Sequence, residues 1–171
     1  SIQEGCDKFC SFCVVPYTRG VEISRPAKQI ISEAKELIGI GAKEIILLGQ
    51  NVNAWSQSNG SNIEMTFPQL IKEISELNID RIRYITSHPR DMTEELMKSH
   101  REISKLQPYL HLPVQSGSDK ILKEMNRGYT SQEYIDIIYK TREYRSDIAI
   151  SGDFIVGFPG ETDDDFQATL D

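Results

Sequence analysis

The sequence predicts an α/β protein built around a parallel β-sheet. Short apolar runs alternate with amphipathic segments along the 171 residues, and this order favours parallel strands joined by right-handed helical crossovers. The run Ile45-Ile46-Leu47-Leu48 is apolar at every position, which is typical of a strand buried on both faces. A doubly wound sheet and a partial (β/α) barrel both satisfy this order of elements.

Five helical regions follow from apolar spacing and from residues that start or end helices. They run from Ala27 to Ile38, from Thr66 to Leu77, from about Thr93 onward, from Ser118 to about Tyr144, and from Thr162 onward. Capping boxes start the second region at Thr66 and Gln69 and restart the fourth at Thr130 and Glu133, after a break at Gly128.

The expected strands lie between these helices. They are Glu44–Leu48, Ile82–Thr86, Tyr109–Leu112 and Ile148–Val156, with residues 1–5 as a further edge strand. Residues 53–65 are rich in Asn, Ser and Gly and are predicted to form a surface loop.

Polar and glycine-rich segments follow every expected strand. They are the three cysteines, Gly49-Gln50-Asn51, Ser87-His88-Pro89, Gln115-Ser116-Gly117-Ser118 and Gly157-Phe158-Pro159-Gly160. Ligands of parallel α/β proteins bind beyond the carboxyl ends of the strands, so we expect these loops to share one rim. The alternative is that each loop uses such residues only for turn geometry and helix caps.

Composition and charge narrow the functional classes. Hydrophobic residues are 39% and charged residues 26%, as in an ordinary globular domain, and no run approaches the ~20 apolar residues of a membrane span. The net charge of −7 indicates that, if the protein binds nucleic acid, the main binding surface lies outside this chain. The chain begins at Ser1 without a signal peptide or initiator Met and ends inside a helix. We therefore expect a piece of a longer protein that lacks a final strand.

The three cysteines fall within eight residues, as Cys6-x3-Cys10-x2-Cys13. An odd, tightly spaced set is a poor disulfide framework and indicates a reducing compartment, which we take to be the cytoplasm. Three thiolates are one short of the usual [4Fe–4S] set and would leave one iron open to a small molecule. A zinc site with His88, His100 or His111 as fourth ligand also remains open, although the spacing favours a cluster.

The segment Cys6-Asp7-Lys8-Phe9-Cys10-Ser11-Phe12-Cys13 resembles the CxxxCxΦC signature of radical S-adenosylmethionine (SAM) enzymes. Further segments resemble the methylthiotransferase family, most closely its tRNA-modifying MiaB type. They are Gln3-Glu4-Gly5-Cys6, Pro16-Tyr17-Thr18-Arg19-Gly20, Ser24-Arg25-Pro26, Leu48-Gly49-Gln50-Asn51-Val52-Asn53, Thr86-Ser87-His88-Pro89, His111-Leu112-Pro113-Val114-Gln115-Ser116-Gly117-Ser118 and Asp153-Phe154-Ile155-Val156-Gly157-Phe158-Pro159-Gly160-Glu161-Thr162. The resemblance implies a partial (β/α)6 TIM-like barrel of the radical SAM type, with parallel strands, truncated before its last strand.

The resemblance also implies the site. Cys6, Cys10 and Cys13 hold a [4Fe–4S] cluster whose open iron takes SAM. Contacts to SAM are expected from Phe12, Gly49, Gln50, Asn51, Gln115, Ser116, Gly117, Ile155, Val156 and Gly157. No catalytic side chain is assigned.

Structural roles compete with several of these assignments. Phe12 could instead serve only in core packing, and the Gly49 segment could serve only to form a turn. Ser118 is expected to be a plain helix cap and His111 to be structural, whereas His88 is a candidate substrate contact. Arg127 is expected either to pair with a carboxylate at the rim or to be solvated.

The implied reaction adds a methylthio group to C2 of an N6-isopentenyladenosine next to the tRNA anticodon, through a 5′-deoxyadenosyl radical. An N-terminal domain with a second [4Fe–4S] cluster and a C-terminal RNA-binding β domain are implied outside residues 1–171. We also expect an electron donor such as flavodoxin or ferredoxin, and a monomer. The alternatives are a methylthiotransferase acting on another tRNA adenosine or on a ribosomal protein, and a non-enzymatic zinc-stabilised binding module.

Overall fold

The computed structural model describes residues 1–60 and 62–171. Its strands are β1 (Gln3–Glu4), β2 (Ile23–Ser24), β3 (Glu44–Leu47), β4 (Ser56–Asn59), β5 (Asn62–Thr66), β6 (Arg81–Tyr84), β7 (Tyr109–His111) and β8 (Ala149–Ser151). Its α-helices are α1 (Val15–Arg19), α2 (Ala27–Gly39), α3 (Phe67–Ser75), α4 (Glu94–Glu102), α5 (Asp119–Glu124), α6 (Ser131–Tyr144) and α7 (Asp163–Leu170). Short 3-10 turns lie at Val52–Ala54 and Pro89–Asp91.

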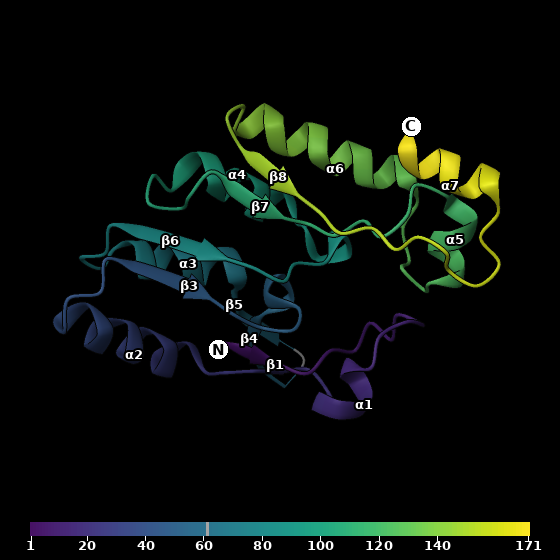
Figure 1. Ribbon diagram of the computed structural model, residues 1–171. Helices are drawn as coiled ribbons and strands as arrows, with labels where there is room; N and C mark the ends of the chain where they lie inside the picture. The colour runs from purple at the N-terminus through teal and green to yellow at the C-terminus, as the bar shows by residue number, and fades with distance from the viewer. Residues whose placement is uncertain (61) are drawn as a thin grey trace.

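The expected parallel strands are confirmed. β3 pairs in parallel with β6, and β7 pairs in parallel with β8. A single parallel bridge between Ile82 and Leu106 links the two pairs, and the Ile2 amide donates to the Leu48 carbonyl at 2.8 Å beside β3. In Figure 1 the arrows of β3, β6, β7 and β8 point toward the end of the molecule that carries α1, α5 and α7. The carboxyl ends of these strands therefore lie at one end of the fold.

Helices α2, α3, α4 and α6 run alongside the strands in Figure 1. The first three bury apolar side chains, whereas those of α6 are only half-buried against the core. Leu70, Ile71 and Ile74 of α3 are fully buried, and the largest buried side chains nearby are Trp55 and Tyr84. Burying each such side chain contributes roughly 1.5–3 kcal/mol, so this layer anchors the loops at the carboxyl ends. None of the helices in the described part of the chain is long and apolar enough to cross a membrane.

The predicted helix starts are also confirmed. Capping boxes are present at Thr66 with Gln69, at Thr130 with Glu133, and at Thr162 with Asp165. Gly128 has a φ of 70° and separates α5 from α6, as the break in the sequence pattern predicts.

The prediction that residues 53–65 form a surface loop is wrong. β4 and β5 form an antiparallel hairpin there, although Ser61 itself lies outside the described residues. The segment Ser56–Asn59 is polar throughout, so no apolar alternation indicates a strand. Trp55 directly precedes β4, is buried, and donates its indole N–H to the Arg25 carbonyl at 3.0 Å.

Two further differences concern the chain ends of the expected sheet. The short helix α1 and the antiparallel β1–β2 pair were not expected from the sequence. The strand expected at Ile148–Val156 is regular only over Ala149–Ser151 and continues as one bridge between Gln115 and Phe154. Gly157, with a φ of 77°, follows this irregular stretch at the rim.

Candidate functional site

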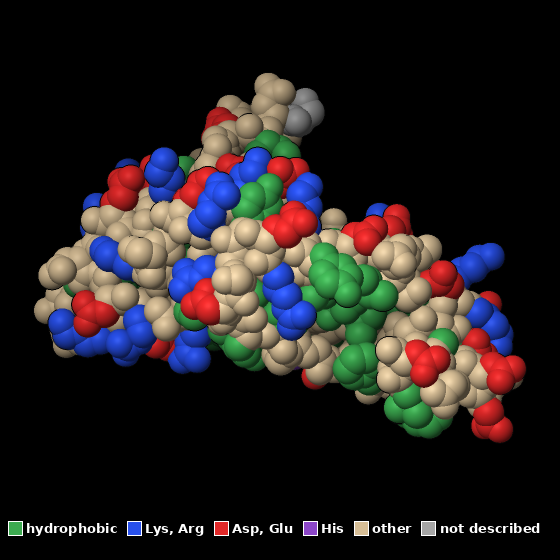
Figure 2. All heavy atoms as spheres, turned by 90° about the horizontal axis from the view of Figure 1, so that it is seen from above, with side chains coloured by type: hydrophobic (Ala, Val, Ile, Leu, Met, Phe, Trp, Pro, Cys, Tyr) green, Lys and Arg blue, Asp and Glu red, His purple; other side chains and the backbone are tan. Residues whose placement is uncertain are grey.

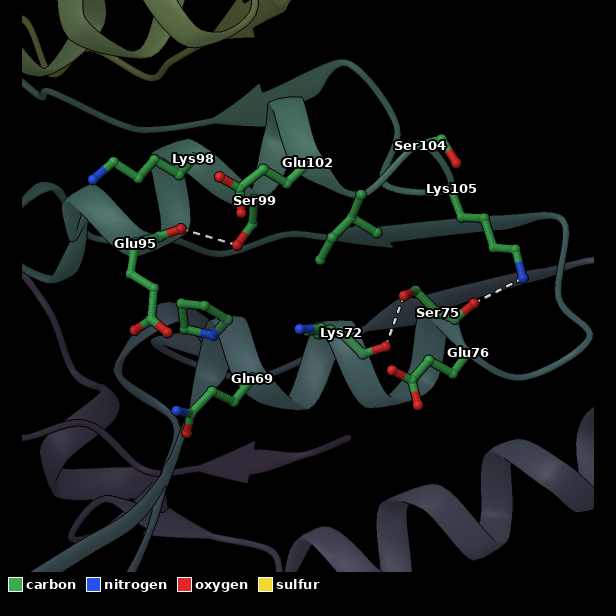
Figure 3. A pocket seen from close by; sticks show the side chains of 12 residues that line it. Gln69, Lys72, Ser75, Glu76, Glu95, Lys98, Ser99, Glu102, Ser104 and Lys105 are labelled. Carbon is green, nitrogen blue, oxygen red and sulfur yellow. Dashed lines mark hydrogen bonds between the residues drawn. The ribbon is translucent and has the colours of Figure 1, made fainter.

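A cavity of about 470 Å³ lies beyond the carboxyl ends of the parallel strands. All three cysteines line it, together with residues that follow β3, β6, β7 and β8. A second cavity, of about 560 Å³, lies between α3 and α4 and is lined largely by lysine, glutamate and serine side chains (Figure 3). The cavity at the strand ends brings the thiols together with parts of the loops after β3, β6 and β7, which confirms the predicted shared rim in part. The segment Gly157-Phe158-Pro159-Gly160 does not line it.

The cysteine loop is held against the end of α5. The Ser11 amide donates to the Met125 carbonyl at 3.0 Å, and the Ser11 hydroxyl donates to the Glu124 carbonyl at 2.8 Å. The Asn126 side-chain amide donates to the Phe9 carbonyl at 3.0 Å. Phe9 and Asn126 both have positive φ, at 50° and 56°, so both turns are tight. These bonds join the loop to a segment more than 110 residues away.

The three thiols are free, and Cys10 is buried while Cys6 and Cys13 are half-buried. Burial raises the pKa of the Cys6 thiol, and the neighbouring acidic group of Glu22 raises it further. The Cys10 sulfur instead accepts a hydrogen bond from Nη1 of Arg127 at 3.4 Å. This bond places a cationic donor against the sulfur of one of the three thiols.

Within the described residues, no three His, Cys, Asp or Glu side chains converge on a point that would hold a single metal ion. A zinc ion needs four ligands around one centre, so the zinc alternative gains no support from this geometry. An iron–sulfur cluster is larger and its cysteines bind different irons, so they need only line one wall. Three free thiols on a common cavity fit that donor set.

Gln3 ties the turn after β3 to the cysteine loop. Its buried side-chain oxygen accepts from the amides of Gln50 at 2.8 Å and Asn51 at 2.9 Å, and its Nε2 donates to the Gly5 carbonyl at 2.7 Å. A Cβ at Gly49 would lie 2.6 Å from the same Gln3 oxygen, so a larger residue there would displace the Gln3 side chain. The Gln50 side chain accepts from the Gly5 amide at 2.7 Å. Gly49 and Gln50 therefore shape the turn, which agrees with their structural interpretation.

Asn51 is the member of this segment with a free polar atom. Its Nδ2 donates to Asp91 at 2.8 Å, and Asp91 is also paired with Lys8 at 2.8 Å. Its Oδ1 is buried and has no partner among the described residues. Because the amide nitrogen is committed to Asp91, the oxygen is held as an acceptor at the cavity.

His88 lines the same cavity and has a buried polar atom without a partner in the described chain. Its Nδ1 accepts from the Arg90 amide at 3.2 Å, which assigns the proton to Nε2, and Nε2 is buried without a partner in the described chain. Burial, with Arg127, Lys8 and Arg90 nearby, lowers the pKa of His88 to about 3. The ring is therefore neutral near pH 7. The Ser87 hydroxyl is likewise buried and unpartnered in the described chain.

Ser116 and Gly117, expected to contact SAM, do not line the cavity. The buried Ser116 hydroxyl lies 3.3 Å from the Thr169 hydroxyl, and the Gly117 amide donates to that hydroxyl at 2.9 Å. A Cβ at Gly117 would lie 2.1 Å from the Ala168 carbonyl oxygen. Both residues are therefore packed against α7, whereas Gln115, with a φ of 79°, does line the cavity.

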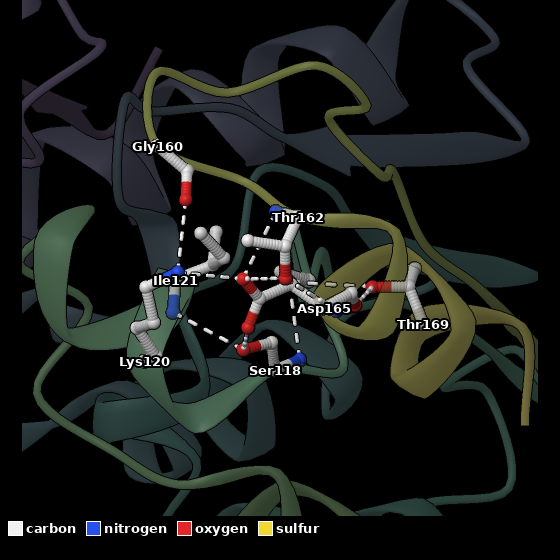
Figure 4. A network of polar contacts seen from close by, with 8 residues as sticks. Ser118, Lys120, Ile121, Gly160, Thr162, Asp165 and Thr169 are labelled. Atoms are coloured by element: carbon white, nitrogen blue, oxygen red, sulfur yellow. Dashed lines mark hydrogen bonds and ion pairs between the residues drawn. The ribbon is translucent and has the colours of Figure 1, made fainter.

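Ser118 caps α5, as expected. Its hydroxyl accepts from the Ile121 amide at 3.4 Å and donates to Asp165 at 2.7 Å (Figure 4). Lys120 is paired with the same carboxylate at 2.7 Å. These bonds hold the pKa of Asp165 well below its usual range.

The remaining predicted contacts lie around the rim. Phe12 lines the cavity with 40% of its surface exposed, so core packing does not account for it. Ile155, Val156 and Gly157 are not among the lining residues, although the Ile155 amide donates to the Gln115 carbonyl at 2.9 Å. Val156 is 62% exposed. His111 lines the cavity and also contacts Ser151 at 2.9 Å, in agreement with its structural interpretation.

Arg127 is not solvated, so that expectation is wrong, whereas its expected place at the rim is confirmed. Among the described residues it pairs with no carboxylate. It is 5% exposed and lines the cavity. The turn at Asn126 and Gly128, both with positive φ, directs the chain inward at this point. Asn126-Arg127-Gly128 was the available signal, because Asn and Gly flank the residues of such turns.

The fold is similar to that of solved radical SAM enzymes. The chain aligns with the cobalamin-dependent SAM radical enzyme OxsB at a TM-score of 0.77 and 17% identity, covering 99% of this chain and 25% of that one. It aligns with the radical SAM methyltransferase TsrM from Kitasatospora setae at a TM-score of 0.75 and 19% identity, covering 99% and 32%.

Sequence similarity is much higher to enzymes named tRNA-2-methylthio-N(6)-dimethylallyladenosine synthase. The identity is 57% to the enzyme from Zymomonas mobilis and 58% to that from Paracoccus denitrificans, over all of this chain. The chain spans 39% of the length of these relatives. The family model of the Radical SAM superfamily matches residues 1–171. The cysteine spacing, the parallel fold and this match over the whole chain agree, and the chain belongs to the radical SAM superfamily.

Proposed function

We propose that this chain is the SAM-cleaving core of a tRNA methylthiotransferase. Cys6, Cys10 and Cys13 hold a [4Fe–4S] cluster with one open iron, and the cavity beside them takes SAM. The carrying observation is that three free thiols share one cavity with Asn51, Ser87 and His88, each of which has a buried side-chain atom (Oδ1, Oγ and Nε2) without a partner among the described residues. Buried polar groups normally have partners, so these three atoms support a polar ligand in that space.

The chain's own residues orient that ligand. Asn51 Oδ1 accepts a hydrogen bond from an ammonium group, and the Asp91–Lys8 pair holds the Asn51 amide in place. His88 Nε2 and the Ser87 hydroxyl are donors suited to carboxylate or ribose oxygens. Phe12 and Gln115 close the cavity around the nucleoside, with Ile155, Val156 and Gly157 at its edge. Ser116 and Gly117 act indirectly by fixing the Gln115 turn against α7.

When bound and reduced, the cluster supplies the electron that cleaves SAM to methionine and a 5′-deoxyadenosyl radical. The protein's part is to exclude water and to hold the reacting groups in one geometry. Burial of Cys10 and Arg127 beside the cavity serves that exclusion. A partial (β/α)6 barrel that continues beyond β8 would enclose the same space.

The substrate is proposed from the relatives, whose names specify a dimethylallyladenosine in tRNA. The net charge of −7 supports a main RNA grip on other parts of the protein. On the face shown in Figure 2, cationic and anionic side chains are interspersed around an apolar patch. We also propose that the whole protein carries a second cluster and receives electrons from an external donor. We propose that it is a monomer in the cytoplasm.

Metal content and magnetic resonance test it. The protein is reconstituted anaerobically with iron and sulfide, reduced with dithionite, and examined by EPR with and without SAM. We expect about four irons and four sulfides per SAM site, and a signal that changes when SAM is added. Cys10→Ser abolishes that signal, while Val14→Ala, at an exposed neighbouring side chain, keeps it. One zinc per chain with no SAM-responsive signal would contradict the proposal.

A further inference from the structure

Arg127 is a buried cation without an anionic partner. Among the described residues its guanidinium contacts no carboxylate, although only 5% of the residue is exposed. Its donors instead reach the Tyr129 hydroxyl at 2.9 Å, the Pro113 carbonyl at 2.7 Å and the Cys10 sulfur at 3.4 Å. A buried charge is strongly disfavoured unless an opposite charge compensates it.

Of these three contacts, only the Cys10 sulfur belongs to a proposed ligand of the cluster. The Pro113 carbonyl is neutral, and burial raises the pKa of the Tyr129 hydroxyl above its ordinary value. The other nearby cation, Lys8, already has Asp91 at 2.8 Å. The Cys10 sulfur becomes a thiolate when it binds a metal centre, and it then supplies the missing negative charge.

The guanidinium is also held in position before any such charge develops. Tyr129 accepts from Nε and in turn donates its hydroxyl to the Val114 carbonyl at 2.8 Å. The guanidinium carbon lies 5.4 Å from the centre of the Tyr129 ring. The planar group thus has two neutral anchors and directs its remaining donor at Cys10.

We propose that Arg127 is a positioning residue that donates a hydrogen bond to the ligating sulfur of Cys10 and raises the reduction potential of the cluster. This inference rests on the proposed function, because it requires a cluster at the three cysteines. Hydrogen bonds to cluster sulfurs are a recognised determinant of potential. Arg127 stabilises the reduced form more, since one added electron increases the negative charge on the sulfurs. The electron comes from a low-potential one-electron reductant, and Arg127 keeps its proton throughout.

The test is an EPR-monitored redox titration of the SAM-responsive signal in the reconstituted protein. Arg127→Gln removes the charge and the directed donor, and Arg127→Lys keeps the charge alone. Arg142→Gln is the matched control, because Arg142 is exposed on α6 and its loss changes the net charge equally. We expect Arg127→Gln to lower the ratio of reduced to oxidised cluster at least tenfold at a fixed potential. For one electron this equals a fall of about 59 mV in the midpoint potential. The midpoint potential of Arg127→Lys should lie between those of the wild type and Arg127→Gln. The midpoint potential of Arg142→Gln should equal that of the wild type.

Equal midpoint potentials for wild type, Arg127→Gln and Arg142→Gln would overturn the inference while leaving the proposed function intact. Absence of any SAM-responsive signal in the wild type would overturn both. If Arg127→Gln fails to fold or retain iron, the wild type labelled with ¹⁵N-guanidino arginine is measured by electron–nuclear double resonance. A ¹⁵N coupling on the reduced signal supports the contact with Cys10, and its absence contradicts it.

Discussion

At the cysteine wall, formed by the three cysteines with Asn51 and His88, buried polar atoms remain without partners in the described chain. At the α7 corner, formed by Ser116, Gly117, Ser118, Asp165 and Thr169, every hydroxyl is bonded to another part of the protein. Both regions arise from Gly-, Ser- and Asn-rich segments that follow parallel strands. Composition therefore does not separate a ligand-binding loop from a packing loop. Accounting for each hydrogen bond does separate them.

The two regions also differ in what their glycines make room for. Gly49 makes room for the buried Gln3 side chain, and Gly117 makes room for the α7 backbone. A side chain such as Gln3 can shift, whereas a helix backbone shifts only with the whole element. We therefore expect the α7 corner to respond to substitution through stability and the cysteine wall through ligand binding.

The largest effect is expected for Gly117→Ala. The new methyl group would lie 2.1 Å from the Ala168 carbonyl oxygen, so α7 must move and the free energy of unfolding falls by about 3 kcal/mol. Gly39→Ala, which meets no atom within 4 Å at the end of α2, is the control. Urea unfolding of both variants measures the difference. A Gly117→Ala protein as stable as the Gly39→Ala protein would contradict the close packing of α7.

A smaller effect on the free energy of unfolding is expected as the pH falls, because His88 is buried in its neutral form. Its folded-state pKa of about 3 lies below the ordinary 6.5, so the unfolded chain binds the proton first as the pH falls. The corresponding stability is complete above pH 6.5 and decreases by about 2 kcal/mol between pH 7 and pH 5.

His88→Gln removes that part of the pH dependence. Buried His100, whose pKa is lowered to about 4, remains and accounts for the rest. The acid dependence of the unfolding free energy should therefore shrink to about half. An unchanged dependence would show that His88 is protonated in the folded protein or is not buried.

The smallest effects come from a crossed pair of substitutions. Asn51→Ala removes the unpartnered oxygen and should weaken SAM binding about tenfold, or ~1.4 kcal/mol. Ser118→Ala removes a helix cap and should lower the unfolding free energy by about 1 kcal/mol without changing the dissociation constant for SAM. Calorimetric titration and urea unfolding measure both quantities for both variants. If Ser118→Ala also weakened SAM binding tenfold, the distinction between the two regions would fail.

Regular elements were largely predictable because their signals are local. Helix starts at Thr66, Thr130 and Thr162 depend on residues three positions apart, and the apolar run of β3 marks a strand. The expectation that this strand is buried on both faces is wrong, because Ile46 is 44% exposed while Ile45 and Leu47 are buried. The β4–β5 hairpin was missed because its strands carry few apolar residues. At the site, the clustered cysteines were evident from spacing alone. The buried role of Arg127 was not, because it depends on a turn that brings residue 127 against residue 10.

The sequence by itself determined the alternation of strands and helices, the rim at the strand ends, and the three thiols on one loop. These properties follow from periodicity and short-range spacing, which adjacent residues encode. Only the tertiary structure decided which polar atoms at that rim remain free. Asn51 and His88 retain unpartnered atoms there, whereas Ser116 and Gly117 are packed against α7. The physical reason is that satisfaction of a hydrogen bond depends on partners contributed by distant segments, which no local pattern specifies.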